Sequence, residues 1–178
     1  MIAIIAEKPS VGQEIARVVG ATEKKDGYIT GNGYMVTWAL GHLVSLALPG
    51  TYGYTRTTAE DLPMLPEPFR LVERQIRTDR GMVTDIAAGR QLKVIDGVFS
   101  ECDSIIVATD AGREGELIFR WIYSHLGCTK PFKRLWFSSL TDEAIRKGMA
   151  DLREGYEYDS LYAAVSYTHL TLPTNSRV

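Results

Sequence analysis

The sequence predicts an α/β protein in which a mostly parallel sheet is covered by helices on both faces and carries an additional β-hairpin. Two short apolar runs, residues 2–6 and 104–109, are typical of strands buried on both faces of a parallel sheet. Each run is followed by apolar residues at helical spacing, and this alternation of strand and helix produces parallel sheets. A glycine-rich turn between two further runs predicts the hairpin.

The elements expected in the first part of the chain follow from local patterns. The strand at residues 2–6 is followed by Pro9, and apolar side chains then recur every three or four positions up to Gly20, which predicts a helix. Residues 28–30 and 34–40 flank a Gly-Asn-Gly sequence, and glycine adopts the positive φ angles that tight hairpin turns need.

The rest of the chain begins with residues 49–68, which are rich in proline and predict irregular structure. The later elements expected are, in order, a strand at residues 69–76, a helix through residues 92–99, the apolar strand at residues 104–109, a helix at residues 113–126, a strand at residues 134–138 and a helix capped by Thr141.

Composition indicates a single globular domain. The chain has 178 residues, of which 45% are apolar and 24% charged, enough to bury a core of its own. A formal net charge of −2 gives no bulk attraction to a polyanion, so nucleic-acid binding would need a local basic patch or a bound cation. Cys102 and Cys128 lack the spacing of a zinc site or a disulfide framework and are typical of a reducing cytoplasm. No run approaches the roughly 20 apolar residues that span a membrane.

Acidic residues directly follow both apolar strands: Glu7 follows the first and Asp110 the second. Ligands of parallel sheets bind at the carboxyl ends of the strands, and neighbouring strands lie roughly 4.8 Å apart. If these strands are neighbours, the two carboxylates meet at one edge, where a cation offsets their repulsion. Mg²⁺ prefers such oxygen ligands. The alternative for Glu7 is an exposed turn in which it pairs with Lys8.

Two glutamates in the following helix receive different interpretations. Glu114 shares a helix face with Leu117 and Trp121, so we expect it to point toward the sheet as a third metal ligand. The alternative is an acid favoured by the positive end of the helix dipole. Glu116 lies elsewhere on the helix, four residues before Arg120, and is expected to form a solvated ion pair.

Four segments carry a resemblance to a known family. They are residues 6–10 (AEKPS), 39–43 (ALGHL), 108–117 (ATDAGREGEL) and 134–141 (RLWFSSLT). In order and spacing they resemble the Toprim domain of bacterial type IA DNA topoisomerases, closest to topoisomerase III. One such motif carries little weight, whereas four in order are specific. The resemblance covers residues 1–164 and implies a Toprim-like fold.

The resemblance also implies roles for individual residues. In this family, the glutamate after the first strand and a later DxDxE segment hold Mg²⁺ and help to position the scissile phosphate. The matching positions are Glu7, Asp110 and Glu114, with Glu7 also managing the proton of the departing 3′ oxygen and Lys8 stabilising phosphate charge. Arg113 is implied in DNA or phosphate contacts, with a surface cation as its alternative.

Two positions receive no metal-binding role. The middle acid of the family segment is replaced by Gly112. Losing this carboxylate should weaken cation affinity and leave more of the coordination shell to water, which Mg²⁺ tolerates, so a single metal with few protein ligands is expected. His42 is interpreted as a histidine of a turn or of the core, with a DNA-contact role as the less favoured alternative.

The reaction implied by the resemblance is DNA strand passage. A tyrosine attacks a phosphodiester of single-stranded DNA, a 5′-phosphotyrosyl bond forms, another strand passes and the break is resealed without ATP. The family's tyrosine lies in a later domain, in a Tyr-Pro-Arg-Thr-like segment, and no such segment occurs among the nine tyrosines here. The chain alone should therefore not cut DNA.

The partners implied by the resemblance are single-stranded DNA and the remaining topoisomerase domains, with no membrane partner. The implied location is the cytoplasm of a bacterium, in association with the nucleoid. Two other classes of protein stay open. A Toprim nuclease or primase would share the strand-end acids, and a noncatalytic metal-dependent DNA-binding module would share the fold.

The resemblance divides the chain into a Toprim domain at residues 1–155, the start of a linker into the next domain at residues 156–164, and a tail at residues 165–178. The tail reads VSYTHLTLPTNSRV, whereas the family continues here as a helix rich in alanine and arginine. We therefore interpret the tail as a non-native extension.

Removing residues 165–178 is expected to leave the melting temperature unchanged, because a tail that breaks the family pattern contributes no native core. Thermal unfolding of the full and shortened chains, followed by circular dichroism, measures the effect. A large drop for the shortened chain would show that the tail is part of the fold.

Overall fold

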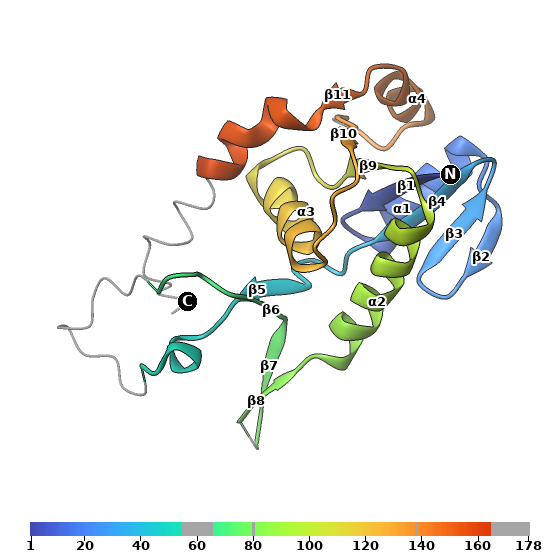
Figure 1. The fold of residues 1–178 in the computed structure, drawn as a ribbon. Helices are drawn as coiled ribbons and strands as arrows, with labels where there is room; N and C mark the ends of the chain where they lie inside the picture. The colour runs from blue at the N-terminus through green and yellow to red at the C-terminus, as the bar shows by residue number, and fades with distance from the viewer. Residues whose placement is uncertain (55–65, 80, 138, 165–178) are drawn as a thin grey trace.

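The computed structural model describes residues 1–54, 66–79, 81–137 and 139–164 (Figure 1). Within these residues a seven-stranded sheet has the order β11-β10-β9-β1-β4-β3-β2. Its strands are β1 (Ile2–Ala6), β2 (Glu23–Lys25), β3 (Tyr28–Gly31), β4 (Tyr34–Trp38), β9 (Ser104–Ala108), β10 (Phe132–Arg134) and β11 (Arg153–Glu154). The helices are α1 (Pro9–Val19), α2 (Ile86–Glu101), α3 (Arg113–His125) and α4 (Asp142–Ala150).

The centre of the sheet is parallel, as the sequence predicts. β1 pairs in parallel with β9 on one side and with β4 on the other, and β10 continues the parallel order beyond β9. In this register Ala6 lies opposite Ala108. The first and second apolar strands are therefore direct neighbours that end at the same edge of the sheet.

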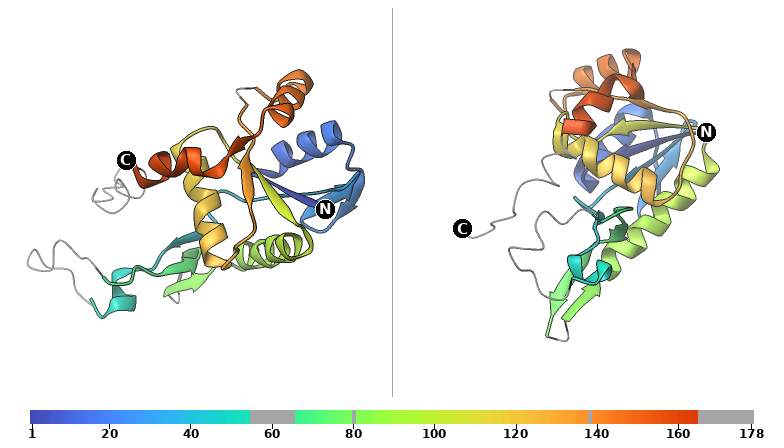
Figure 2. Two further views of the ribbon diagram at one scale, coloured as in Figure 1. Left: turned by 45° about the horizontal axis from the view of Figure 1, so that its top comes forward. Right: turned by 60° about the vertical axis from the view of Figure 1, so that its left-hand side comes forward.

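Helices cover both faces of the sheet because its central strands alternate their buried side chains (Figure 2). Ala3 and Ile5 of β1 belong to a cluster with the apolar residues of α2 and α3, whereas Ile4 and Ala6 belong to a cluster with α1 and α4. Because its side chains are all apolar, β1 contributes to the hydrophobic clusters on both faces of the sheet.

The hairpin is confirmed, and one of its strands has an additional role. β3 and β4 are antiparallel and are joined through Gly31, Asn32 and Gly33, whose φ angles are 145°, 50° and 82°. The Asn32 side chain donates to the carbonyl oxygen of Val19 at 2.7 Å, which ties the turn to the end of α1. We expected the hairpin as an addition to the parallel sheet; instead β4 is part of the parallel centre, because it pairs with β1.

Caps mark the ends of three helices, and two of these ends, at Gly20 and Thr141, are predicted by the sequence. Gly20 ends α1 in the left-handed conformation, with a φ angle of 80°. The Asp85 carboxylate accepts a hydrogen bond from the backbone N–H of Ala87 and caps α2. The Thr141 hydroxyl accepts from the backbone N–H of Ala144 and caps α4, as its sequence position predicts.

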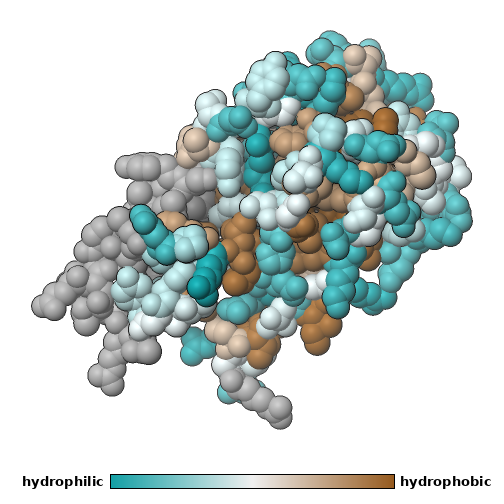
Figure 3. Space-filling view, viewed as in Figure 1, coloured by the Kyte–Doolittle hydropathy of each residue, from teal (hydrophilic) through white to brown (hydrophobic). Residues whose placement is uncertain are grey.

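An extension of the fold lies between β4 and α2. β5 (Val44–Leu46) pairs with β6 (Leu71–Glu73), and β7 (Gln75–Thr78) pairs with β8 (Gly81–Thr84). Exposed apolar side chains occur in the β7–β8 hairpin and at the start of α2, and Figure 3 shows apolar surface over this lower part of the molecule. Of the stretch predicted to be irregular, residues 49–52 form a short 3-10 helix, η1 (Pro49–Tyr52), and residues 55–65 lie outside the described part.

The single strand predicted at residues 69–76 is wrong, because Arg74 separates β6 from β7. Its backbone N–H donates to the carbonyl oxygen of Leu43, and its guanidinium donates to Asp85 at 2.6 Å. The same guanidinium donates to the carbonyl oxygens of Leu40 and His42 at 2.9 and 3.2 Å. These contacts turn the chain and connect the extension to the loop after β4.

The strand predicted at residues 134–138 is also displaced. β10 spans Phe132–Arg134, so Arg134 is its last residue, although the backbone N–H of Leu135 still donates to the carbonyl oxygen of Val107 at 2.9 Å. The chain then leaves the sheet as Trp136 stacks on Tyr158, with ring centroids 5.1 Å apart. Ser138 lies outside the described residues.

The chain leaves the sheet through η3 (Gly155–Tyr158), and residues 159–164 are helical. The predicted boundary at residue 155 and the linker at residues 156–164 remain predictions, and the tail lies outside the described residues.

None of the helices within the described ranges is both long and apolar enough to cross a bilayer. Cys102 and Cys128 are free thiols, and burial raises the pKa of Cys102.

Gln91→Met is expected to destabilise the fold by about 1–3 kcal/mol, because it leaves buried acceptors without their donor. The Gln91 amide donates to the carbonyl oxygen of Trp38 at 2.8 Å and lies 3.2 Å from both the Thr37 hydroxyl and the Gly27 carbonyl oxygen. Urea unfolding measures the change. Lys93→Met, at an exposed position of the same helix, is the control and should change stability little.

Candidate functional site

Glu7 and Asp110 meet where β1 and β9 end, as the sequence predicts. The Glu7 carboxylate accepts a hydrogen bond from the backbone N–H of Asp110 at 3.2 Å. The Glu7 side chain is 13% exposed, whereas Asp110 lies at the surface. This edge therefore presents two carboxylates from neighbouring parallel strands, one half-enclosed and one open to solvent.

Two predicted basic residues lie at the same edge. The Lys8 ammonium is 3.9 Å from the Glu7 carboxylate, and its side chain is 59% exposed. Arg113 is exposed at the first turn of α3. Both cations are at the N-terminal ends of helices that begin near the carboxylates, so both are accessible to an anionic ligand. Their roles remain predictions.

Glu114 does not point toward the sheet, so that expectation is wrong. Its side chain is 62% exposed, and its carboxylate lies 3.1 Å from Nε2 of His42 in the loop after β4. The buried residues of α3 begin one position later, at Gly115. His42 also packs edge-on against Trp121, with ring centroids 5.9 Å apart.

The three predicted metal ligands consequently do not form one cluster. Among the described residues, no three histidine, cysteine, aspartate or glutamate side chains are gathered so that they could hold a metal ion. Glu7 and Asp110 are adjacent, and Glu114 is held on His42. Of the three predicted ligands, the structure thus brings together two, Glu7 and Asp110, and their metal-binding role remains a prediction.

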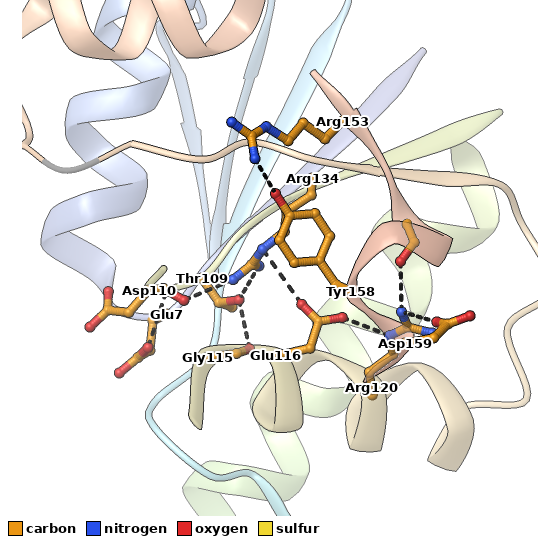
Figure 4. A network of polar contacts seen from close by, with 11 residues as sticks. Glu7, Thr109, Asp110, Gly115, Glu116, Arg120, Arg134, Arg153, Tyr158 and Asp159 are labelled. Atoms are coloured by element: carbon orange, nitrogen blue, oxygen red, sulfur yellow. Dashed lines mark hydrogen bonds and ion pairs between the residues drawn. The ribbon is translucent and has the colours of Figure 1, made fainter. Parts of the chain in front are cut away.

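Glu116 is buried, which is the opposite of the solvated position expected. The expected contact with Arg120 is present at 2.7 Å, but the Glu116 side chain is only 1% exposed (Figure 4). On its other side, Oε2 of Glu116 lies 3.5 Å from Nε of Arg134, which is also 1% exposed. Spacing within α3 cannot reveal this partner, because Arg134 belongs to a different strand.

Arg134 is the residue of the site that sequence reasoning missed. Its guanidinium donates to the Thr109 hydroxyl at 2.6 Å and to the carbonyl oxygen of Asp110 at 2.8 Å (Figure 4). Burial lowers the pKa of Arg134, and the Glu116 carboxylate partly offsets this effect. The signals in the sequence are that Arg134 begins the RLWFSSLT segment of the resemblance and that it is a charged residue beside an apolar run.

Glycines shape the loop between Asp110 and α3. A Cβ atom at Gly115 would overlap the backbone carbonyl of Asp110, so this glycine lets the helix approach the strand end. The Thr109 hydroxyl also donates to the carbonyl oxygen of Gly115 at 2.7 Å. Gly112 differs: its backbone is extended, with a φ angle of 178°, and a Cβ there would meet no atom within 4 Å. A side chain at position 112 would fit.

A hollow of about 480 Å³ opens beside Asp110. Its lining residues are Asp110, Ala111, Trp136, Phe137, Ser139 and Leu140. The segment after β10 thus forms an apolar wall next to the open carboxylate. A ligand that contacts Asp110 has room on this side of the strand end.

The chain is similar in sequence to a known domain family and to two named proteins. The family profile described as the Toprim domain matches residues 2–140. DNA topoisomerase 3 of Bacillus thuringiensis (strain Al Hakam) is 48% identical over 166 residues, which cover 90% of this chain and 21% of that protein. DNA topoisomerase 3 of Bacillus subtilis (strain 168) is 46% identical over 163 residues, covering 89% of this chain and 21% of that protein. The chain therefore spans about a fifth of the length of these relatives.

A solved structure shares the fold. Full-length topoisomerase I from Thermotoga maritima superposes with a TM-score of 0.52, covering 85% of this chain and 21% of that one. The two sequences are 20% identical over this region, so the likeness concerns the arrangement of helices and strands.

Gly115→Ala is expected to lower stability by roughly 1–3 kcal/mol, because the added methyl group forces the helix away from Asp110. The matched control is Gly97→Ala in α2, where a Cβ meets nothing within 4 Å and alanine should raise stability by about 0.5–1 kcal/mol. Denaturant unfolding measures the change in the free energy of unfolding for each variant, which should be a decrease for Gly115→Ala and an increase for Gly97→Ala. Stabilisation by both substitutions would contradict the close approach at Gly115.

Proposed function

Because this chain belongs to the Toprim domain family, we propose that it supplies the metal-binding part of the active site of a type IA DNA topoisomerase related to topoisomerase 3. The observation that carries the proposal is the meeting of Glu7 with Asp110 at the ends of two neighbouring parallel strands. Ligand sites of parallel sheets lie at this edge.

We propose Mg²⁺ as the resident cation, held by Glu7 and Asp110. Mg²⁺ commonly takes one or two protein carboxylates and completes its octahedral shell with water and substrate phosphate, so two acids fit this ion. Glu114 can join them only by leaving His42, from which its carboxylate is 3.1 Å away. When bound, the cation would stabilise negative charge on the phosphate undergoing transfer.

The other roles belong to side chains of the same edge. The half-enclosed Glu7 holds the proton that passes to and from the 3′ oxygen when the phosphodiester is broken and resealed. Lys8 and Arg113, both exposed, stabilise phosphate charge and hold the strand in place. The phosphorus forms a bond to a tyrosine oxygen as its bond to the 3′ oxygen breaks, and that tyrosine comes from outside this chain.

Single-stranded DNA is the proposed substrate, and the remaining part of a longer protein supplies most of its binding surface. The relatives extend well beyond the matched region, since the chain covers 21% of their length. The net charge of −2 gives the isolated chain few phosphate contacts, so its own DNA binding is weak.

The metal site is tested by calorimetric titration of Mg²⁺ into the wild type, Asp110→Asn and Gly112→Asp. Asp110→Asn should lose most of the affinity because it removes one of two charged ligands. Gly112→Asp should bind more tightly, since position 112 has room for a side chain and regains an oxygen ligand. Asp96→Asn, an exposed position of α2, is the control for loss of one surface charge.

Equal Mg²⁺ affinity of wild type and Asp110→Asn would remove Asp110 from the site.

Whether this chain supplies the nucleophile is tested by incubating it with labelled single-stranded DNA and Mg²⁺ and then denaturing the mixture. No covalent adduct is expected, because the nucleophile lies elsewhere. An adduct would show that one of the chain's own tyrosines reacts.

A further inference from the structure

A buried ionic cluster lies directly beneath the Asp110 backbone. Arg134 and Glu116 are each 1% exposed, come from β10 and α3, and face one another across 3.5 Å. Neither Nε of Arg134 nor Oε2 of Glu116 has a hydrogen-bond partner among the described residues. Two charges removed from water stabilise a fold weakly, if at all, compared with apolar side chains of similar size. The burial of the pair is therefore weak evidence for a role in stability alone.

The contacts of Arg134 converge on the residue that carries the open carboxylate. One arm of the guanidinium donates to the Thr109 hydroxyl at 2.6 Å, and the other donates to the Asp110 carbonyl oxygen at 2.8 Å. The N–H of the same residue, Asp110, donates to Glu7 at 3.2 Å. The backbone of Asp110 is thus held from both sides, on its carbonyl by Arg134 and on its N–H by Glu7.

Glu116 in turn orients Arg134. Its Oε1 accepts from Nε of Arg120 at 2.7 Å, and its Oε2 faces Nε of Arg134, so the carboxylate is fixed between two guanidinium groups. The Arg120 side chain is 17% exposed and donates further to Asp159 at 2.7 Å and to the carbonyl oxygen of Gly155 at 2.9 Å. Figure 4 shows this succession of charges running from Asp110 to Asp159.

We propose that Arg134, held by Glu116, is a positioning residue that sets the place of Asp110 relative to Glu7 and so makes the pair competent to bind a divalent cation. The inference rests on the proposed metal site, and it adds residues that do not touch the metal or the phosphate. Partners of this kind, behind the ligands, typically change metal affinity roughly ten- to a hundredfold when they are removed.

The charge of Arg134 and its hydrogen bonds are expected to have opposite effects on cation affinity, so the two can be separated by experiment. Arg134 is positively charged and lies near two carboxylates, so its charge alone would weaken the binding of a divalent cation there. Its hydrogen bonds to Thr109 and Asp110 should instead strengthen that binding, because they position Asp110. The double substitution Arg134→Met with Glu116→Gln removes one positive and one negative charge and leaves the net charge unchanged. Replacing both members of a buried ion pair is also tolerated better than removing one.

The experiment measures Mn²⁺ binding by electron paramagnetic resonance and, without metal, hydrogen exchange of the Asp110 amide by nuclear magnetic resonance. For the double variant we expect roughly tenfold weaker Mn²⁺ binding and faster exchange at Asp110, with cooperative thermal unfolding retained. Ile145→Val is the stability control, because Ile145 is fully buried in α4, which packs on the other face of the sheet. It should leave both quantities at wild-type values.

A second pair of variants decides the question should the double variant not fold. Thr109→Val removes the hydroxyl that Arg134 contacts and should weaken Mn²⁺ binding, whereas Thr109→Ser keeps the hydroxyl and should retain wild-type affinity. Folded variants that bind Mn²⁺ and protect the Asp110 amide like the wild type would overturn the positioning role. Such a result together with loss of binding in Asp110→Asn leaves the metal site intact, whereas unchanged binding in Asp110→Asn removes both proposals.

Discussion

The parallel pairing of β1 with β9 is the constraint on which both the core and the site depend. Because Ala6 lies opposite Ala108, the strands end together. Glu7 is the first residue after β1 and Asp110 is the second after β9, so both leave the sheet at the same end. The same register divides alternate side chains between two helical layers. A slip of one residue would exchange the faces of a strand and move one carboxylate by about 3.3 Å along the strand direction, out of line with the other. Core packing and placement of the acids are therefore specified by a single register.

Elements with a strong local pattern could be predicted from the sequence, and elements defined by distant partners could not. β1 and β9 are continuous apolar runs, a pattern that buried parallel strands require, and Gly31–Gly33 predicts the hairpin turn. The place of β4 beside β1 is a property of the assembled sheet, so the hairpin could be predicted without its role in the parallel centre. The break at Arg74 likewise depends on acceptors more than thirty residues away in sequence.

The same distinction separates the parts of the site. Glu7 and Asp110 could be predicted because their position at the end of a strand is a local property. The two glutamates of α3 were assigned to the wrong environments because a helix face is defined by what packs on it. Gly115 brings the helix against the Asp110 backbone, and Arg134 enters from β10, so Glu116 is buried while Glu114 lies outside beside His42. Helical periodicity contains neither of these facts.

The contact between Arg120 and Asp159 connects the segment after η3, through Glu116 and Arg134, to the end of the sheet that carries Asp110. Residues 159–164 form a helix that follows η3, and Arg120 donates both to Asp159 at the start of this helix and to the carbonyl oxygen of Gly155 in η3. Arg120 also contacts Glu116, which faces the guanidinium that holds the Asp110 backbone. A line of ion pairs and hydrogen bonds thus joins the helix at residues 159–164 to the carboxylate end of the sheet, in addition to the packing of Tyr162 against the core.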